Sequence, residues 1–310
     1  MTLHRYVPEK YYTALGSFEP VLRIIEGDTV ITTTVDNAGY DAADQQVTKR
    51  GNPQTGPFYI EPAEPGDTLV IQFDRLSPNR RIGRSAKVIA YNTIDPDFVP
   101  EMPSRYPRTY VEWELDLQTG LATFLQADGT PGSLHLSLTP MMGCFGVAPD
   151  HGQIISSSTS GTYGGNMDYN GFTTGVTVYL PVFAPGGLLF MGDGHACQGD
   201  GEILGTGIEV SFDVQFTVDV LKDKTIFWPR GESADYIFTV GNTRPLTQAL
   251  QHATTEMIRW LHEDYTLNTD EIHQLMGQCI EYDVGNVYDP AFTMVCKLQK
   301  SFLKDYRLKS

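Results

Sequence analysis

The stretch VTVYLPVFAPGGLLFM, Val176–Met191, is apolar throughout and is divided by Ala184-Pro185-Gly186-Gly187. Short apolar runs that are rich in branched or aromatic residues and bounded by Pro and Gly favour two buried strands joined by a turn. The chain then continues directly into MGDGHACQGDGE, Met191–Glu202. This second run has four glycines and no helical apolar stripe, so we expect a tight polar loop carried on a strand scaffold.

Strand signals continue in both directions from this stretch. The segments Arg23–Asp36 and Glu64–Asp74 each place a β-branched run after a Gly-Asp-Thr turn, and the two aspartates lie 39 residues apart (67 − 28 = 39). No helical pattern separates these segments, which favours an antiparallel sandwich or barrel over a parallel sheet. Further strands are expected at Pro57–Ile60, Tyr110–Leu125, Ser133–Leu138 and Ile203–Val220.

The last part of the chain has a different pattern. Apolar residues recur at helical spacing over Thr247–Leu261, and a second helix is expected over Thr269–Ile280, with Thr269 as its N-cap. A turn and a final strand follow in Asp283–Lys300. The sequence therefore predicts a mainly β protein: an antiparallel β-sandwich or barrel-like body at residues 1–220, with a smaller α+β segment, residues 221–310, packed on it.

Composition and charge restrict the possible partners. Apolar residues make up 41% of the chain and charged residues 19%, which is typical of a globular protein. The formal net charge of −16 argues against a nucleic acid or an anionic membrane as partner. We expect no transmembrane helix, no signal peptide, a cytoplasmic location and four free cysteines.

An arginine-rich stretch, Leu76–Arg108, is a candidate subunit contact, and we expect a homo-oligomer, a dimer or larger.

The glycine-rich run also contains the types of residue that bind metals or move protons. Asp193 and His195 are separated by one residue, so on an extended segment their side chains point the same way. Such a pair is half of a zinc-type site that other segments must complete. The run is not an EF-hand, because Glu202 follows Asp193 by nine residues and not by eleven (202 − 193 = 9).

Several motifs together resemble the acetamidase/formamidase family. They are, in order, TVD at Thr34–Asp36, GPFYIEPAEPGDTL at Gly56–Leu69, GCFGVAP at Gly143–Pro149, GGNMD at Gly164–Asp168, YLPVFAPGGLLF at Tyr179–Phe190 and MGDGHACQGDGE at Met191–Glu202. The resemblance extends over roughly residues 20 to 215. The chain has EPAEPGD where the family usually has EGAEPGD, and it is rich in sulfur around Met141, Met142 and Cys144, which bears on the choice of substrate.

The resemblance implies a β-rich fold that hydrolyses a small amide, such as formamide or acetamide, to ammonia and a carboxylate. It also implies a metal-bearing site and supports Asp193 and His195 as site residues. We expect Asp36 to complete a divalent metal site with them, with zinc as the first candidate and calcium as the second.

Amide hydrolysis also needs proton transfer, because ammonia leaves only after its nitrogen is protonated. Glu61, which follows the strand Pro57–Ile60, and Glu202 are the candidates for this step. Asn166 and the neighbouring glycine amides are candidates to hold the developing oxyanion.

Two other functions fit the same residues. In the first, Cys197 is the nucleophile of an amidase or lactamase and forms an acyl-enzyme. In the second, the protein is a non-catalytic β-sandwich module whose acidic glycine loop binds a cation such as calcium. His195 argues against the second alternative, because calcium prefers oxygen ligands.

Overall fold

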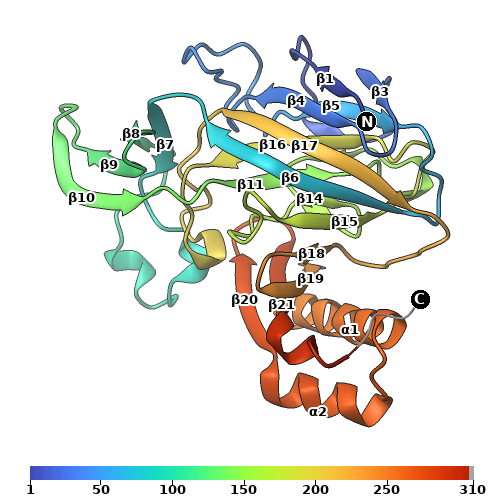
Figure 1. Ribbon diagram of the computed structural model, residues 1–310. Helices are drawn as coiled ribbons and strands as arrows, with labels where there is room; N and C mark the ends of the chain where they lie inside the picture. Colours follow the sequence, from blue (N-terminus) through green and yellow to red (C-terminus); the bar gives the residue numbers. More distant parts are fainter. Residues whose placement is uncertain (307–310) are drawn as a thin grey trace.

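Two large β-sheets form the body of the protein, as the computed structural model shows for the residues it describes, 1–306 (Figure 1). The larger sheet has nine strands in the order β1-β4-β17-β6-β15-β18-β19-β21-β20. In chain order these are β1 (Leu3–Arg5), β4 (Thr29–Thr34), β6 (Thr68–Pro78), β15 (Thr177–Pro181), β17 (Phe212–Leu221), β18 (Arg230–Glu232), β19 (Tyr236–Thr243), β20 (Glu281–Asn286) and β21 (Phe292–Gln299).

The second sheet has six strands in the order β13-β14-β11-β16-β5-β3. They are β3 (Leu22–Ile24), β5 (Thr55–Ile60), β11 (Met141–Gly146), β13 (Ser160–Gly161), β14 (Gly164–Asn166) and β16 (Leu189–His195). Aromatic side chains from the two sheets meet in the core, with ring centroids 5.3 Å apart for Phe58 and Phe216 and 5.1 Å apart for Phe73 and Phe145. The body is therefore a sandwich of open sheets, which confirms the predicted fold class.

Smaller elements surround the sandwich. A four-stranded sheet, β10-β9-β8-β7, projects from one end of it (Figure 1). Its strands are β7 (Ile82–Ala86), β8 (Tyr110–Asp116), β9 (Leu121–Leu125) and β10 (Pro131–Ser137), and a separate pair joins β2 (Ala14–Leu15) to β12 (Ile155–Ser156). The short 3₁₀ helices are η1 (Tyr91–Thr93), η2 (Val99–Glu101), η3 (Asp150–Gly152), η4 (Asp200–Glu202) and η5 (Lys300–Leu303).

The two Gly-Asp-Thr turns noticed in the sequence have matching roles. Strands β4 and β6, which follow them, pair antiparallel with opposite edges of β17. In each turn the aspartate carboxylate accepts a hydrogen bond from the backbone N–H three residues earlier, Ile25 to Asp28 at 3.2 Å and Glu64 to Asp67 at 2.8 Å. The same type of turn therefore precedes β4 and β6, the two strands that flank β17.

The C-terminal part extends the larger sheet. Strand β18 pairs with β15 of the body, so the sheet continues without a break across the predicted boundary at residue 220. Two helices, α1 (Leu246–Asp264) and α2 (Thr269–Cys279), accompany these strands (Figure 1). Helix α1 buries Ala253, Met257 and Leu261 in a second apolar cluster with residues of β19 and β21.

The start of α2 corrects one detail of the prediction. Its N-cap is Asn268 and not Thr269: the Asn268 side chain accepts from the backbone N–H of Glu271 at 3.0 Å, and the Glu271 carboxylate accepts from the Asn268 N–H at 2.8 Å. Asn and Thr are both good N-caps, but the reciprocal hydrogen bonds with Glu271 make Asn268 the N-cap. Among residues 1–306, neither helix is long and apolar enough to cross a membrane.

Candidate functional site

The first half of the glycine-rich run is a strand and not the expected loop. Residues 191–195 form the end of β16, buried between β11 and β5. A Cβ atom at Gly194 would lie 2.4 Å from the ring of Phe212, so glycine is needed there for close packing. The chain leaves the sheet only after His195 and then enters η4.

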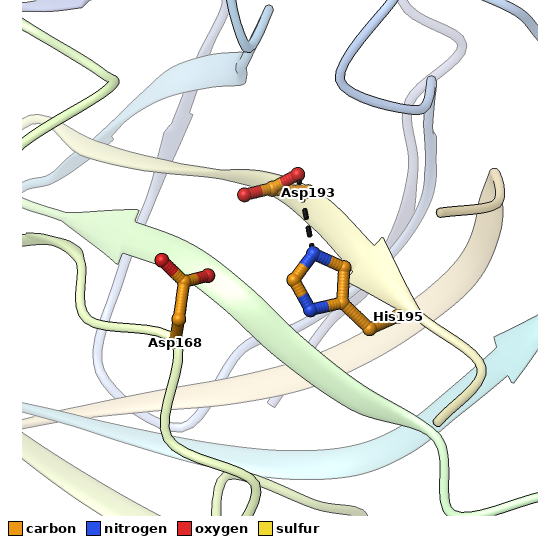
Figure 2. Close-up of side chains that lie close together, drawn as sticks. All are labelled: Asp168, Asp193 and His195. Atoms are coloured by element: carbon orange, nitrogen blue, oxygen red, sulfur yellow. Dashed lines mark ion pairs between the residues drawn. The ribbon is translucent and has the colours of Figure 1, made fainter. Parts of the chain in front are cut away.

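Three side chains meet where β16 ends (Figure 2). Asp193 and His195 come from β16, and Asp168 comes from the segment after β14, on the other side of β11. His195 Nε2 lies 3.5 Å from Asp193 Oδ1, and one potential ligand atom from each of the three lies within 4.8 Å of the others. A Cβ atom at Gly143 of β11 would lie 2.5 Å from Asp168 Oδ1, so glycine at this position makes room for that carboxylate.

Three further carboxylates complete the group. Glu209 Oε1 lies 3.1 Å from His195 Nε2, and Glu202 of η4 falls within 4.8 Å of both. Asp289, from the loop between β20 and β21, is grouped in the same way with Asp168 and Glu202. All six side chains are buried. We call them the carboxylate–histidine cluster: Asp168, Asp193, His195, Glu202, Glu209 and Asp289.

The cluster holds an unusual number of polar atoms without partners. Buried polar groups in folded proteins are nearly always hydrogen-bonded, because an unpaired one costs free energy. Here one atom on each of five cluster residues is buried without a hydrogen bond: Asp168 Oδ1, Asp193 Oδ1, His195 Nε2, Glu202 Oε2 and Glu209 Oε2. His195 Nε2 approaches Glu209 and Asp193, but without hydrogen-bond geometry.

Burial and mutual repulsion shift the pKa values of the cluster. Burial is the largest cause of the raised pKa of Asp168 and Glu202, and neighbouring carboxylates raise both further. Burial likewise raises the pKa of Glu209 to about 8 and that of Asp289 to about 6. Burial would lower the pKa of His195, but the charges of Glu209 and Asp193 outweigh it and raise this pKa. Positive charge at the centre of the cluster would therefore stabilise its ionised form.

Backbone conformation at the cluster is also uncommon. Asp168, Asp193 and Glu202 have φ angles of 45°, 61° and 46°, in the left-handed region that side chains other than glycine rarely adopt. Such residues gather at functional sites, where the surrounding structure holds them in place. The surrounding structure thus holds three residues of the cluster in strained backbone conformations.

Gln198 determines which nitrogen of His195 carries the proton. The Gln198 amide nitrogen donates to the carbonyl oxygens of Asp168 at 2.6 Å and Gly285 at 3.3 Å. Its oxygen is therefore the atom that faces His195 Nδ1, at 2.8 Å, and an amide oxygen only accepts. Nδ1 must donate, which leaves Nε2 of the neutral ring with its lone pair directed at the cluster.

A chain of side-chain amides supports the other side of the cluster. Asn52 Nδ2 donates to Asn166 Oδ1 at 2.6 Å and to Asp193 Oδ2 at 3.1 Å, while Gln54 Nε2 donates to Asn52 Oδ1 at 2.9 Å. Asn166 Nδ2 in turn donates to the carboxylate of Asp289. These bonds orient the amides and hold Asn166 beside the cluster, while its role in holding the oxyanion stays a prediction.

A cavity of about 190 Å³ opens onto the cluster, and we call it the cluster cavity. It is lined by Asn37, Arg50, Gly51, Asn52, Arg108, Tyr110, Ser158, Asn166, Asp193, Glu202, Gly205, Glu209, Tyr288 and Asp289. A larger depression of about 590 Å³ lies along β8 and β9, but no cluster residue lines it. Of these two spaces, only the cluster cavity is lined by buried carboxylates, which makes it the candidate binding site.

Known proteins show the same architecture and related sequences. A profile described as the acetamidase/formamidase family matches residues 158–298. The crystal structure of an acetamidase from Yersinia enterocolitica is 32% identical, covers 98% of this chain and 93% of its own, and superposes with a TM-score of 0.83. The chain belongs to the acetamidase/formamidase family. The predicted resemblance is therefore confirmed.

Two other relatives define the extent of the likeness. A structure from Thermoanaerobacter tengcongensis, described as a predicted acetamidase/formamidase, is 26% identical over 98% of both chains, with a TM-score of 0.84. The acetamidase of Mycolicibacterium smegmatis is 39% identical over 84 residues, which are 27% of this chain and 20% of the acetamidase. The chain thus aligns with about a fifth of that curated relative, but with nearly all of the solved structures.

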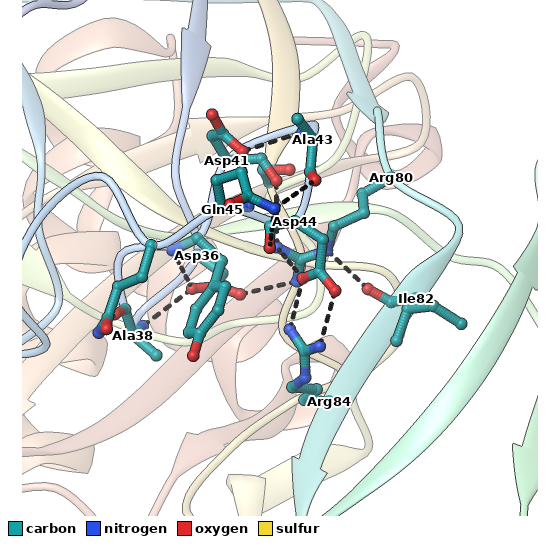
Figure 3. Close-up of polar contacts among 12 residues, drawn as sticks. Asp36, Ala38, Asp41, Ala43, Asp44, Gln45, Arg80, Ile82 and Arg84 are labelled. Atoms are coloured by element: carbon teal, nitrogen blue, oxygen red, sulfur yellow. Dashed lines mark hydrogen bonds and ion pairs between the residues drawn. The ribbon is translucent and has the colours of Figure 1, made fainter. Parts of the chain in front are cut away.

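The Asp36 side chain lies outside the carboxylate–histidine cluster, which contradicts its predicted role as a metal ligand. One carboxylate oxygen, Oδ2, forms a buried ion pair with Arg80 Nη2 at 2.7 Å (Figure 3). The other, Oδ1, accepts from the backbone N–H groups of Ala38 and Tyr40 at 3.0 and 2.9 Å. The aspartate of the TVD motif therefore holds the loop after β4 against Arg80.

Glu61 is also outside the site. Its side chain is 46% exposed and pairs with Arg23 at 3.3 Å on the surface. Glu61 follows β5, the strand next to β16. The Glu61 carboxylate nevertheless does not line the cluster cavity. The prediction that Glu61 transfers a proton is therefore wrong, whereas Glu202, its alternative, lies in the cluster.

Cys197 lies next to the cluster without taking part in it. The residue is partly buried against the apolar core and is absent from the lining of the cluster cavity. His195 Nδ1 is occupied by Gln198, and in the described part of the chain no hydrogen bond joins Cys197 to either ring nitrogen. The geometry gives no support to the thiol nucleophile.

Four members of the site were missed by sequence reasoning. Asp168 belongs to the GGNMD motif, and Glu209 interrupts an apolar run between Ile208 and Val210, so the sequence indicates both residues. Gln198 lies inside the glycine-rich run. Asp289 comes from a loop about ninety residues further on, and nothing in its local sequence links it to the others.

Proposed function

We propose that this chain is an amidohydrolase that cleaves small linear amides to ammonia and a carboxylate, with a divalent cation bound in the carboxylate–histidine cluster. One observation carries the proposal: unpartnered ligand atoms on five buried side chains converge beside a small cavity. Family membership supplies the reaction class, because the solved relatives include a protein described as an acetamidase.

The residues fit a cation through their donor atoms. We assign the binding to Asp168, Asp193 and His195, which offer two carboxylate oxygens and one imidazole nitrogen within 4.8 Å of one another. A mixed nitrogen and oxygen set suits zinc or a related transition metal, whereas calcium prefers oxygen alone. When bound, such a cation polarises an amide carbonyl and lowers the pKa of water.

Two glutamates are our candidates to move protons. Glu202 and Glu209 line the cluster cavity, and each has one buried oxygen, Oε2, without a hydrogen-bond partner. We assign to this pair the removal of a proton from the attacking water and the delivery of one to the leaving nitrogen. Both transfers are needed, because the amide nitrogen is a poor leaving group until it is protonated.

Asn166 is the candidate donor to the amide oxygen. It lines the cluster cavity, and its Nδ2 donates one N–H to the carboxylate of Asp289. The second N–H of the same nitrogen remains for a ligand carbonyl. Because Asn52 and Asp289 hold the side chain from two sides, this donor is oriented before a substrate arrives, as electrostatic stabilisation requires.

Ammonia release across a short amide series tests this proposal. We expect turnover of at least one of formamide, acetamide and propionamide, its loss after treatment with a chelator, and its recovery on addition of zinc. Loss of activity on thiol alkylation alone, with no effect of the chelator, would contradict the metal assignment. Bound calcium without any ammonia release would instead support a non-catalytic cation-binding module.

A further inference from the structure

Three arginines and two tyrosines from distant segments stack in alternation. The guanidinium carbon of Arg50 lies 4.9 Å from the ring centroid of Tyr110, and that of Arg108 lies 5.5 Å from the same ring. Arg108 is also 5.5 Å from the ring of Tyr288, which Arg105 approaches to 5.0 Å. We call this series the arginine–tyrosine ladder. In each of these cation–π contacts the ring face attracts the guanidinium group.

The arginines of the ladder have no carboxylate partners. Within residues 1–306, none of Arg50, Arg105 and Arg108 forms an ion pair, although the chain carries a net charge of −16. Arg105 Nη2 donates to the carbonyl oxygen of Leu204 at 2.7 Å, and Arg108 Nη2 donates to that of Gly205 at 2.5 Å. Arg108 Nε is buried and has no partner. Carbonyl oxygens hold these guanidinium groups in place but leave their charge unpaired.

The arginine–tyrosine ladder faces the same space as the cluster. Arg50, Arg108, Tyr110 and Tyr288 line the cluster cavity together with Asp193, Glu202 and Glu209. The cluster residues are buried, whereas Arg108 is half-buried and Arg50 is exposed, so these two arginines lie toward solvent, and the buried Arg105 does not line the cavity. The cavity therefore has reacting groups at its inner end and unpaired cations at its outer end.

The size of the cavity adds a second argument. A volume of about 190 Å³ is below the range of roughly 300–1,000 Å³ usual for drug-sized ligands, yet it corresponds to several water molecules of ~30 Å³ each. Formamide or acetamide at the cluster would leave much of this space to water. A longer acyl chain would instead extend from the cluster to the arginines.

We propose that the preferred substrates are short amides whose acyl chain ends in a carboxylate, the monoamides of dicarboxylic acids, and that Arg108 binds this carboxylate. A planar guanidinium matches a carboxylate with two parallel hydrogen bonds, and Arg108 lines the cluster cavity while its charge is not paired with any carboxylate among residues 1–306. Arg50 adds positive charge from the exposed side. This substrate class rests on the amide hydrolysis proposed above.

The reaction balances without any further reactant. A water oxygen bonds to the amide carbon, the carbon–nitrogen bond breaks, and the nitrogen leaves as ammonia with a proton from the site. The product is a dicarboxylate whose distal carboxylate is unchanged throughout. The guanidinium of Arg108 therefore acts on binding and orientation, not on the bond that is cleaved.

The test compares two amides of the same length, succinamate and the uncharged 4-oxopentanamide, by ammonia release from the metal-loaded protein. We expect kcat/KM for succinamate to exceed that for the uncharged amide by roughly tenfold or more, as a charge-assisted hydrogen bond implies. In Arg108→Gln, kcat/KM for succinamate should fall by roughly ten- to a hundredfold, and that for 4-oxopentanamide should fall clearly less, because its ketone loses only an uncharged hydrogen bond. Arg108→Lys should recover only part of the loss, because it keeps the charge but not the fork.

Two variants keep the result interpretable. Arg50→Gln, at an exposed position where folding is not at risk, should show a smaller loss that is confined to succinamate. Arg81→Gln, an exposed arginine that pairs with Glu114 and lies outside the cluster cavity, should change neither substrate.

Equal kcat/KM for the two amides in the wild type would overturn the inference but leave amide hydrolysis standing. An equal loss for both amides in Arg108→Gln would do the same, because it would mean that the arginine only offsets the charge of the cluster. Absence of ammonia from every amide, acetamide included, would overturn the proposed function and this inference together.

Discussion

Gln198 and His195 form a hydrogen bond of 2.8 Å in which the amide oxygen accepts from Nδ1. Because the Gln198 nitrogen is held by two carbonyl oxygens, the amide cannot turn over without losing both bonds. His195 therefore directs Nε2, a buried atom without a hydrogen-bond partner, at the carboxylates. The pair explains why a glutamine lies three residues after the histidine of the glycine-rich run.

Replacement of Gln198 by leucine should weaken metal binding by roughly 10–100-fold, since partners that orient a ligating histidine contribute on that scale. Competition with a chelator gives the affinity, and ¹⁵N chemical shifts of the His195 ring give the tautomer without any turnover. Gln118→Leu, an exposed glutamine on the loop between β8 and β9, is the matched control. Unchanged affinity and an unchanged tautomer in Gln198→Leu would refute the positioning role.

Asp36→Asn should reduce the free energy of unfolding and leave the metal site intact. Its carboxylate forms a 2.7 Å pair with Arg80 in which both side chains are almost fully buried, and removing one partner of such a pair costs about 3–5 kcal/mol. Denaturant unfolding measures the loss. Glu61→Gln, at the exposed pair with Arg23, should leave the free energy of unfolding nearly unchanged. Loss of bound metal in Asp36→Asn at unchanged stability would restore Asp36 as a ligand.

Asp67 should make stability depend on pH in the acid range. Burial acts to raise its pKa, but the Lys222 ammonium and the backbone N–H groups of Asp223 and Glu64 outweigh burial and lower it. A carboxyl with a lowered pKa stabilises the fold above its unfolded pKa of ~3.9, and this contribution is lost as the pH falls through the folded value.

Asp67→Asn should therefore cost about 1.5–3 kcal/mol at pH 7, the usual contribution of hydrogen bonds to a charged group. The difference from wild type should shrink below a pH of about 4, which urea unfolding at several pH values can follow. Asp235→Asn, an exposed aspartate before β19, is the control and should show no such trend. A difference that is constant from pH 7 to pH 3 would contradict the linkage.

Cys197→Ala should keep ammonia release within a few-fold of wild type. The residue packs on the apolar core and does not line the cluster cavity, so its loss removes packing and not chemistry. Steady-state kinetics on acetamide, with Cys279→Ala as a second half-buried cysteine for comparison, measure this. Complete loss of turnover in Cys197→Ala, with normal folding and normal metal content, would reinstate the thiol mechanism.

Much of the fold could be predicted from local patterns. The runs after Gly27-Asp28 and Gly66-Asp67 are strands, and both lie beside β17. The prediction is wrong at residues 191–195 because glycine usually indicates a turn, whereas Gly194 lies in a buried strand. Glycine is needed there because the ring of Phe212 comes too close for any side chain. Close packing between sheets depends on residues that are distant in the sequence.

The site was only partly predictable for a similar reason. Asp193 and His195 were identified because they lie together in the sequence, and Glu202 and Asn166 because they lie in distinctive motifs. The sequence predicts Asp36 as a third ligand, but its carboxylate pairs with Arg80, 44 residues further on, and no local pattern reveals that contact. Asp289 enters through the pairing of β20 with β21, which no local pattern reveals.

The central claim is that a cation bound by the carboxylate–histidine cluster supports amide hydrolysis, and its most direct test measures metal content and ammonia release together. Wild type, Asp193→Asn and the control Asp200→Asn, an exposed aspartate on the same segment, should be compared after loading with zinc. We predict about one zinc per chain and full activity in wild type and in Asp200→Asn. Asp193→Asn should lose the metal and at least ~10³-fold in kcat/KM, which is about 4 kcal/mol of transition-state stabilisation. A folded Asp193→Asn protein that keeps its turnover without metal would contradict the account.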